Sequence, residues 1–155
     1  LVAGLEKEVF LPWIGLVQRT ETTIAGPLTY NLVYAALGGV TFAAEPQLSF
    51  SLSVANRMAR MTLRNTQTNP VAVAFPSGQD FDLVLKDQSG TEVYRWSAGK
   101  MFTQIFRNLQ ITGEKNWVAV IPDSVPDGRY TAEAFLSTAP PGQYTASVAI
   151  ELKSK

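Results

Sequence analysis

Three aspartates in one short stretch are the first residues whose spacing could do chemistry. Asp80 and Asp82 stand one residue apart, and Asp87 follows five residues later. A side-chain period of two puts the first two carboxylates on one strand face, about 7 Å apart. Clustered carboxylates are the ligands that Ca²⁺ favours, but the stretch lacks the glycine and the distal glutamate of a calcium loop. The plainer interpretation is that Asp80 and Asp82 face water on the outer side of a sheet.

A serine–lysine pair is the second such arrangement. Ser97 stands three residues before Lys100 in SAGK. That spacing resembles a motif of penicillin-binding enzymes, but none of their other motifs is present. A turn that contains both residues is the favoured interpretation. Paired carboxylates for glycoside chemistry stay open, because nothing singles out a pair among the 13 acidic residues. A hydrolase is therefore the weakest functional hypothesis, and we expect no catalytic residue.

Three tryptophans, Trp13, Trp96 and Trp117, offer aromatic faces on which a sugar ring could stack. Trp96 ends one predicted strand and Trp117 begins another. Large aromatic side chains at such positions usually pack in the core or at its edge. We therefore favour packing over a carbohydrate site, and the sugar platform stays open as the alternative.

Composition excludes several classes of function. The 155 residues include no cysteine and no histidine, which removes disulfides, thiolate chemistry, the commonest zinc ligand and the usual general base. We accordingly expect no metal and no cofactor. Lys plus Arg and Asp plus Glu are 13 each, and a net charge of zero disfavours nucleic acid as a partner. No apolar run approaches the roughly 18 residues of a membrane span, so none is predicted.

Alternation of apolar and polar residues predicts strands over most of the chain from residue 47 onward. In QLSFSLSV the apolar side chains point to one face and the serines to the other. MTLRN and NPVAVAF follow with their apolar residues on one face, and Pro70 stands at a strand start, where its missing N–H costs no hydrogen bond. Residues 99–109 carry the best helical pattern, for which we expect a short turn or an irregular connection.

The aspartates belong to a predicted β-hairpin, DFDLVLKDQSGTEVYRW, in which Phe81, Leu83 and Leu85 share the dry face. Further strands are expected in NWVAVI, RYTAEAFL and QYTASVAIEL. Turns at roughly every 8–12 residues are typical of an all-β sandwich, so we predict an immunoglobulin-like antiparallel β-sandwich. PDGRY resembles the tyrosine corner of such folds, in which the hydroxyl, here of Tyr130, bonds to nearby backbone.

Residues 1–45 differ from the rest of the chain. WIGLVQRTETTIAGPLTYNLVYAAL predicts two strands joined by a turn at Ala25, Gly26 and Pro27, and GGVTFAAEP predicts a joint. Two strands are too few to be stable alone. We therefore expect a β-hairpin extension over residues 1–45, as the remnant of an upstream domain, and a sandwich domain over residues 46–155. The first residue is Leu1 rather than methionine, so a longer parent protein is expected.

Several short motifs, in one order and spacing, resemble the bacterial intracellular proteinase inhibitor family, often called BsuPI-like. The resemblance covers about residues 46–137. PDGRYT is similar to the family's closing motif, whereas NWVAVIPDSVPDGRY is shorter than the family's segment. The other matching elements are the alternating strand SFSLSV, the turn at 65–69, Phe75 with SGQ, the pair Phe81 and Asp82, the turn at 87–90, VYRWS and GKMFTQ.

The resemblance implies an immunoglobulin-like sandwich that is not an enzyme and that binds a protein partner, a subtilisin-like serine protease. Such inhibitors present a stiff, exposed segment to the protease cleft as an extra strand. Three turns are candidates, at residues 57–60, 77–80 and 97–102, and the last is favoured because long side chains follow a glycine. The candidate protease-contact residues are Ser97, Gly99, Lys100, Met101 and Phe102, and the candidate second loop comprises Ser77, Gly78, Gln79 and Asp80.

Two alternatives stay open at this point. Met101 and Phe102 could be core residues, because large apolar side chains are usually buried. The chain could also be a structural or adhesive immunoglobulin-like module of a larger bacterial envelope protein, since GLVQRTETTIAGPLTYNLVYA resembles the closing hairpin of bacterial envelope domains. The family implies the bacterial cytoplasm, whereas a larger envelope parent implies export. Arg57, Arg60 and Arg64 are expected to be solvated along a hairpin.

Overall fold

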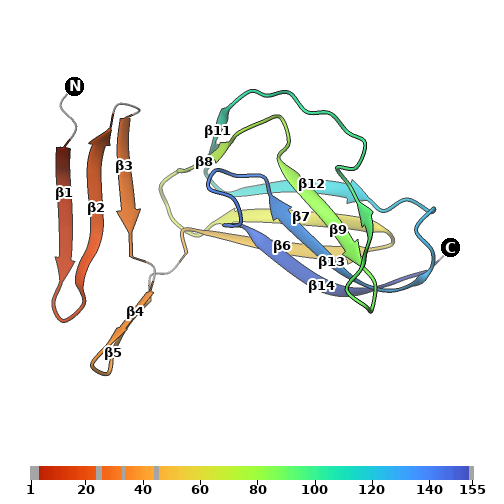
Figure 1. Cartoon of the computed structure of the whole chain (residues 1–155), viewed down its shortest axis with the longest axis horizontal. Coiled ribbons are helices and arrows are strands. Elements are labelled where there is room, and N and C mark those ends of the chain that lie inside the picture. Colours follow the sequence, from red (N-terminus) through yellow and green to blue (C-terminus); the bar gives the residue numbers. More distant parts are fainter. Residues whose placement is uncertain (1–3, 24–25, 33, 44–45, 154–155) are drawn as a thin grey trace. The chain divides into compact units, whose positions relative to one another are not determined.

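The fold is all-β in a computed structural model that describes residues 4–23, 26–32, 34–43 and 46–153 (Figure 1). The chain divides into two compact units, Leu1–Pro46 and Gln47–Lys155. Within the described ranges, no helix is long and apolar enough to cross a membrane.

The first unit contains a three-stranded antiparallel sheet and a separate hairpin. The predicted pair of strands is present as β2 and β3, although Ala25 of the predicted turn lies outside the described residues. A further strand, β1, pairs with β2 and was not predicted. The predicted joint includes a short hairpin, β4 with β5, and its residues 44 and 45 also lie outside the described residues. The strands are β1 (Gly4–Leu11), β2 (Gly15–Thr23), β3 (Gly26–Asn31), β4 (Tyr34–Leu37) and β5 (Val40–Ala43).

The second unit is a β-sandwich built by the strands that alternation predicted, with one exception. The strand β11 begins within the 99–109 stretch, for which we expected a short turn or an irregular connection. One sheet has the order β12-β7-β6 and the other β10-β9-β13-β14, while β11 pairs with β8, and the pairings are antiparallel. Its strands are β6 (Leu48–Ala55), β7 (Met58–Asn65), β8 (Val71–Phe75), β9 (Phe81–Lys86), β10 (Glu92–Arg95), β11 (Arg107–Ile111), β12 (Glu114–Val120), β13 (Gly128–Leu136) and β14 (Thr145–Leu152).

One hydrophobic core joins the two sheets of the sandwich to the β8–β11 pair. The predicted dry faces supply it, and on β6 the serines are exposed while the apolar residues between them pack inward. Burying apolar surface in this way is the main stabilising term of such a fold. The largest fully buried side chains are Phe75, Met61, Leu63, Leu83, Leu85, Ile121 and Leu136.

Strand β9 is buried on both faces, which alternation did not predict. Its first five residues are all buried, and Asp82 and Val84 on the outer face are as inaccessible as their core-facing neighbours. The strand lies between β10 and β13, and Arg95 of β10 and the following Ser97 bond to Asp82 on the face that was expected to be wet. This covered face carries the carboxylate that organises the candidate site.

Two turns at the ends of the sandwich are held by side-chain hydrogen bonds. The Tyr130 hydroxyl donates to the Pro126 carbonyl at 3.0 Å, which confirms the predicted tyrosine corner. The prediction that Arg57 is solvated is wrong: its side chain is only 12% exposed and donates to the carbonyls of Pro122 and Val125 and to Asp127. Arg57 has a positive φ of 62°, and its guanidinium lies against the loop that follows β12.

The turn of the β9–β10 hairpin depends on the ionised form of Asp87. Its carboxylate accepts hydrogen bonds from the Ser89 hydroxyl at 2.6 Å and from the Ser89 and Thr91 amides. These bonds, that of the Ser89 hydroxyl first, lower the pKa of Asp87 below its ordinary value of 3.8.

We therefore expect this turn to loosen only in strong acid. Because the folded pKa lies below the unfolded one, the stabilising contribution is present above about pH 4 and is lost as the pH falls through the folded value. The NMR shifts of the Ser89 and Thr91 amides should titrate with a common midpoint below 3.8. A midpoint above 3.8 would contradict the assignment, and Asp87→Asn should abolish the titration.

Candidate functional site

An irregular, exposed segment connects β10 to β11, and we call residues 97–106 the 97–106 loop (Figure 1, the green segment leading to β11). It contains every residue of the favoured candidate contact loop. Met101 is 99% exposed, and Ile105 and Phe106 are each 60% exposed. The alternative that Met101 is a core residue is thus wrong, whereas Phe102 is half-buried. Exposed apolar side chains gathered on one segment are typical of a surface that binds another protein.

The loop begins with a tight turn held by a buried carboxylate. Asp82 accepts hydrogen bonds from the Ser97 amide at 3.0 Å, from the Ser97 hydroxyl at 2.6 Å, from the Leu83 amide at 2.9 Å and from Arg95 Nη1 at 3.0 Å. Gly99 has a φ of 74°, which favours glycine, and the Lys100 amide donates to the Ser97 carbonyl.

The prediction that Asp82 faces water is wrong, because Asp82 is only 3% exposed. Burying a carboxylate is costly unless donors and a cation compensate it, and here four donors do so. One donor is the guanidinium of Arg95. Hydrogen bonds to two carboxylates raise the pKa of Arg95 above its ordinary value, and the bond to Glu92 has a larger effect than the bond to Asp82. Arg95 therefore stays a cation at any working pH.

The loop ends against a second carboxylate, that of Asp80. Arg107 Nη2 donates to Asp80 at 2.5 Å, and Trp117 Nε1 donates to its other oxygen at 2.8 Å. Arg107 also donates to the Ser77 carbonyl at 2.9 Å. The side chain of Asp80 is 22% exposed, so the predicted wet position is wrong for most of its surface.

The 77–80 turn, proposed from sequence as a second contact loop, lies against the 97–106 loop. Its residues Ser77, Gly78, Gln79 and Asp80 are half-buried. The Gly78 amide donates to the Thr103 carbonyl at 2.7 Å. The turn therefore supports the stretch that carries Met101, and sequence reasoning missed this role. A clue was available for Asp82, since Arg95 lies on the neighbouring predicted strand, whereas no strand was predicted for the stretch that contains Arg107.

Gly78→Ala tests that support. A Cβ at this position would collide with Thr103 Oγ1 and lie 3.3 Å from the Thr103 amide nitrogen. We expect the free energy of unfolding in urea to fall by about 1–3 kcal/mol, because the packed loop must shift. Adding Thr103→Ala should recover part of the loss, whereas Gly113→Ala, with open space around its Cβ, should change stability by no more than about 0.5 kcal/mol. Equal stability of Gly78→Ala and the parent chain would contradict the close approach.

The Trp96 ring contacts the residues on both sides of Met101 in the sequence, Lys100 and Phe102. The Trp96 ring lies 4.3 Å from the ring of Phe81, a core residue, and 6.0 Å from that of Phe102. Lys100 Nζ lies 3.3 Å from the Trp96 ring centroid, in a cation–π contact. The backbone is thereby held on both sides of the exposed methionine.

Trp96 and Trp117 are used for packing, as favoured from the sequence, whereas that prediction is wrong for Trp13. Trp96 packs between Phe81 and the loop, and Trp117 is buried and donates to Asp80. Trp13 is exposed and belongs to the first unit. The pair Ser97 and Lys100 also has other partners, because the hydroxyl donates to Asp82 and the ammonium lies over Trp96.

The three aspartates do not form the calcium site considered from the sequence. Asp80 and Asp82 are held by arginine and other donors, and Asp87 is engaged in its own turn. Among residues that the structure describes, no group of three acidic side chains could hold a metal ion.

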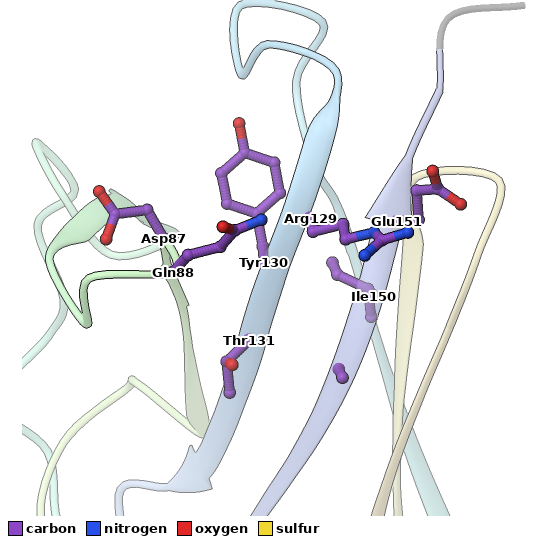
Figure 2. Close-up of a pocket in the computed structure, with 8 residues that line it drawn as sticks. Asp87, Gln88, Arg129, Tyr130, Thr131, Ile150 and Glu151 are labelled. Carbon is purple, nitrogen blue, oxygen red and sulfur yellow. The ribbon is translucent and has the colours of Figure 1, made fainter.

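A surface depression of about 560 Å³ lies beside the β9–β10 turn, between that turn and the adjoining parts of β13 and β14 (Figure 2). Figure 2 shows the carboxylates of Asp87 and Glu151 on opposite sides of Tyr130. These two acids thus do not converge on one point, as an acid–base pair must. The strands that line the depression are β13 and β14, whereas the 97–106 loop connects β10 to β11.

Comparison with known proteins agrees with the resemblance drawn from the sequence. A family model described as BsuPI, intracellular proteinase inhibitor, matches residues 44–155. The match takes in the whole sandwich and the 97–106 loop, and it extends beyond the stretch on which the resemblance was based. No curated protein matches the chain.

Proposed function

The chain belongs to the BsuPI family of intracellular proteinase inhibitors, and from this membership we propose that its sandwich inhibits a subtilisin-like serine proteinase and catalyses no reaction itself. The observation that carries the proposal is the 97–106 loop, which presents a fully exposed Met101 between two anchored ends. The candidate contact residues Ser97, Gly99, Lys100, Met101 and Phe102 lie on this segment.

Rigidity is what such a segment needs in order to inhibit. A flexible loop loses conformational entropy when a protein partner binds, whereas a pre-ordered loop has already lost it during folding. Here Asp82 holds the start of the loop, Trp96 holds its middle and Gly78 holds Thr103 near its end. A contact of the usual size, about 1,600 Å² in total, requires neighbouring surface as well, and the exposed Ile105 and Phe106 supply apolar area beside Met101.

Titration of a subtilisin-type proteinase with the intact chain tests the proposal. Residual proteinase activity should fall linearly with added chain and reach its minimum near one equivalent. A synthetic substrate that the proteinase turns over slowly reports this activity without displacing the chain from the proteinase. A proteinase that prefers basic residues provides the control and should keep its activity, because the exposed tip of the loop is apolar. Full activity at micromolar excess of the chain would contradict the proposed function.

A second function is favoured by one observation in the first unit. Its β1-β2-β3 sheet and the β1–β2 turn carry large apolar residues that are more than half exposed, and this region lies outside the family match. Among them are Leu5, Phe10 and Tyr30 in the sheet and Trp13 in the turn. Such a surface suits a structural or adhesive module of an envelope protein. Co-sedimentation of the intact chain with bacterial cell walls, lost in Trp13→Ser but retained in Met101→Asp, would support it.

A further inference from the structure

We propose that the proteinase attacks the peptide bond between Met101 and Phe102, and that Trp96 retains both sides of this bond so that cleavage is reversed rather than completed. This inference rests on the proposed function and deepens it by naming the reactive bond. It also names the class of partner: a serine proteinase whose primary pocket takes a long, unbranched, apolar side chain.

Exposure singles out Met101 as the residue that enters the pocket. At 99% its side chain is more exposed than any other large hydrophobic side chain in the described residues. Its neighbours are turned back onto the protein, with Lys100 Nζ 3.3 Å from the Trp96 ring centroid and the Phe102 ring 6.0 Å from it. A partner that approaches the loop therefore meets the methionine first.

The chemistry follows from an ordinary serine proteinase. Its serine oxygen attacks the carbonyl carbon of Met101 while its general base takes the serine proton. The bond from that carbon to the Phe102 nitrogen then breaks, and the proton passes to the nitrogen. An acyl-enzyme on Met101 and a free amine on Phe102 result. Water can hydrolyse the ester, or the Phe102 amine can attack the same carbon, re-form the amide and return the proton to serine.

Retention of the amine decides between these two outcomes. Holding two reacting groups in place converts a bimolecular step into one with a high effective concentration. The Phe102 ring rests on Trp96, which stacks on Phe81 in the core, and the Thr103 carbonyl accepts a hydrogen bond from the Gly78 amide. The new amine thus stays beside the acyl carbon and excludes water, and resynthesis outpaces hydrolysis.

The test is prolonged incubation of the intact chain with a catalytic amount of subtilisin, followed by acid quenching and mass spectrometry. We expect a single break after residue 101, with cleaved and intact chains reaching a constant ratio. The cleaved chain, purified without denaturation, should still inhibit. Met101→Lys should move both the inhibition and the break from subtilisin to trypsin, at the same bond.

A second pair of variants tests the contact between Trp96 and Phe102. Phe102→Ala removes the ring that rests on Trp96, and its hydrolysis after residue 101 should be at least about 10-fold faster, so that inhibition becomes temporary. Val120→Ala shortens an exposed apolar residue on β12, outside the loop, and should hydrolyse at the parent rate. Urea unfolding of each variant shows whether it is still folded. Faster cleavage of a loosened loop can then be distinguished from cleavage of an unfolded chain.

The outcomes separate this inference from the proposed function. Inhibition with a break elsewhere, inhibition with no break at all, or unchanged hydrolysis in Phe102→Ala would overturn the reactive bond and leave the inhibitor intact. Absence of inhibition by the parent chain would remove the proposed function and this inference with it.

Discussion

The Met101→Asp variant will bind a subtilisin-type proteinase about 100-fold or more weakly than the parent chain, as measured by the inhibition constant. Residues that fill a pocket at the centre of an interface carry most of the binding energy, and a carboxylate in an apolar pocket finds no hydrogen-bond donor. Because the side chain is 99% exposed in the free protein, the urea midpoint should stay unchanged.

Met58→Asp is the matched control for that prediction. Met58 is also an exposed methionine, at 46%, and it begins β7 directly after Arg57, in the 57–60 segment that the sequence offered as a contact turn. We expect this variant to inhibit as strongly as the parent chain. Loss of inhibition in Met58→Asp with retention in Met101→Asp would transfer the contact surface to the 57–60 turn.

The Asp82→Ala variant will lose about 3 kcal/mol of unfolding free energy in urea, which is the largest stability effect that we expect from a single polar side chain here. The carboxylate accepts four hydrogen bonds, two of them from Ser97 and one from the Leu83 amide inside β9. Its removal leaves buried donors without an acceptor. The Arg95 side chain is 37% exposed, so its charge regains water and limits the loss.

Glu92→Gln is the control for Asp82→Ala. Glu92 bonds to the same guanidinium at 2.6 Å, but its side chain is 41% exposed. Exposed ion pairs contribute little, so we expect a change of no more than about 1 kcal/mol. An Asp82→Ala variant as stable as Glu92→Gln would show that the buried network does not hold the loop. The folded Asp82→Ala variant would then inhibit as strongly as the parent chain.

Local pattern was enough to predict most of the sandwich. Side chains of a strand alternate between two faces whatever lies around them, so the dry faces of β6, β8 and β9 could be assigned from the sequence. Turn chemistry was equally local: Tyr130 bonds to a carbonyl four residues away, and Asp87 bonds within its own hairpin. In the first unit, β1 escaped prediction because GLEKEVFL lacks a clear alternation.

The candidate site was predicted in part, as a list of residues without their roles. Alternation puts Asp82 on the face of β9 opposite to Leu83, but it does not say whether that face is covered. Cover comes from Arg95 and Ser97, residues 13 and 15 positions further along. Composition could not decide whether Met101 was buried, because the same apolar side chain suits a core and an interface.

Residue types and neighbours along the chain were enough to establish the all-β class, the faces of most strands, the lack of thiol and imidazole chemistry, and the family motifs. Only the folded chain shows that two aspartates expected in water anchor the ends of the 97–106 loop, and that Trp96 contacts both sequence neighbours of an exposed methionine. Those contacts join residues brought together by the pairing of distant strands, and a carboxylate becomes buried only where that pairing delivers enough donors to replace its water.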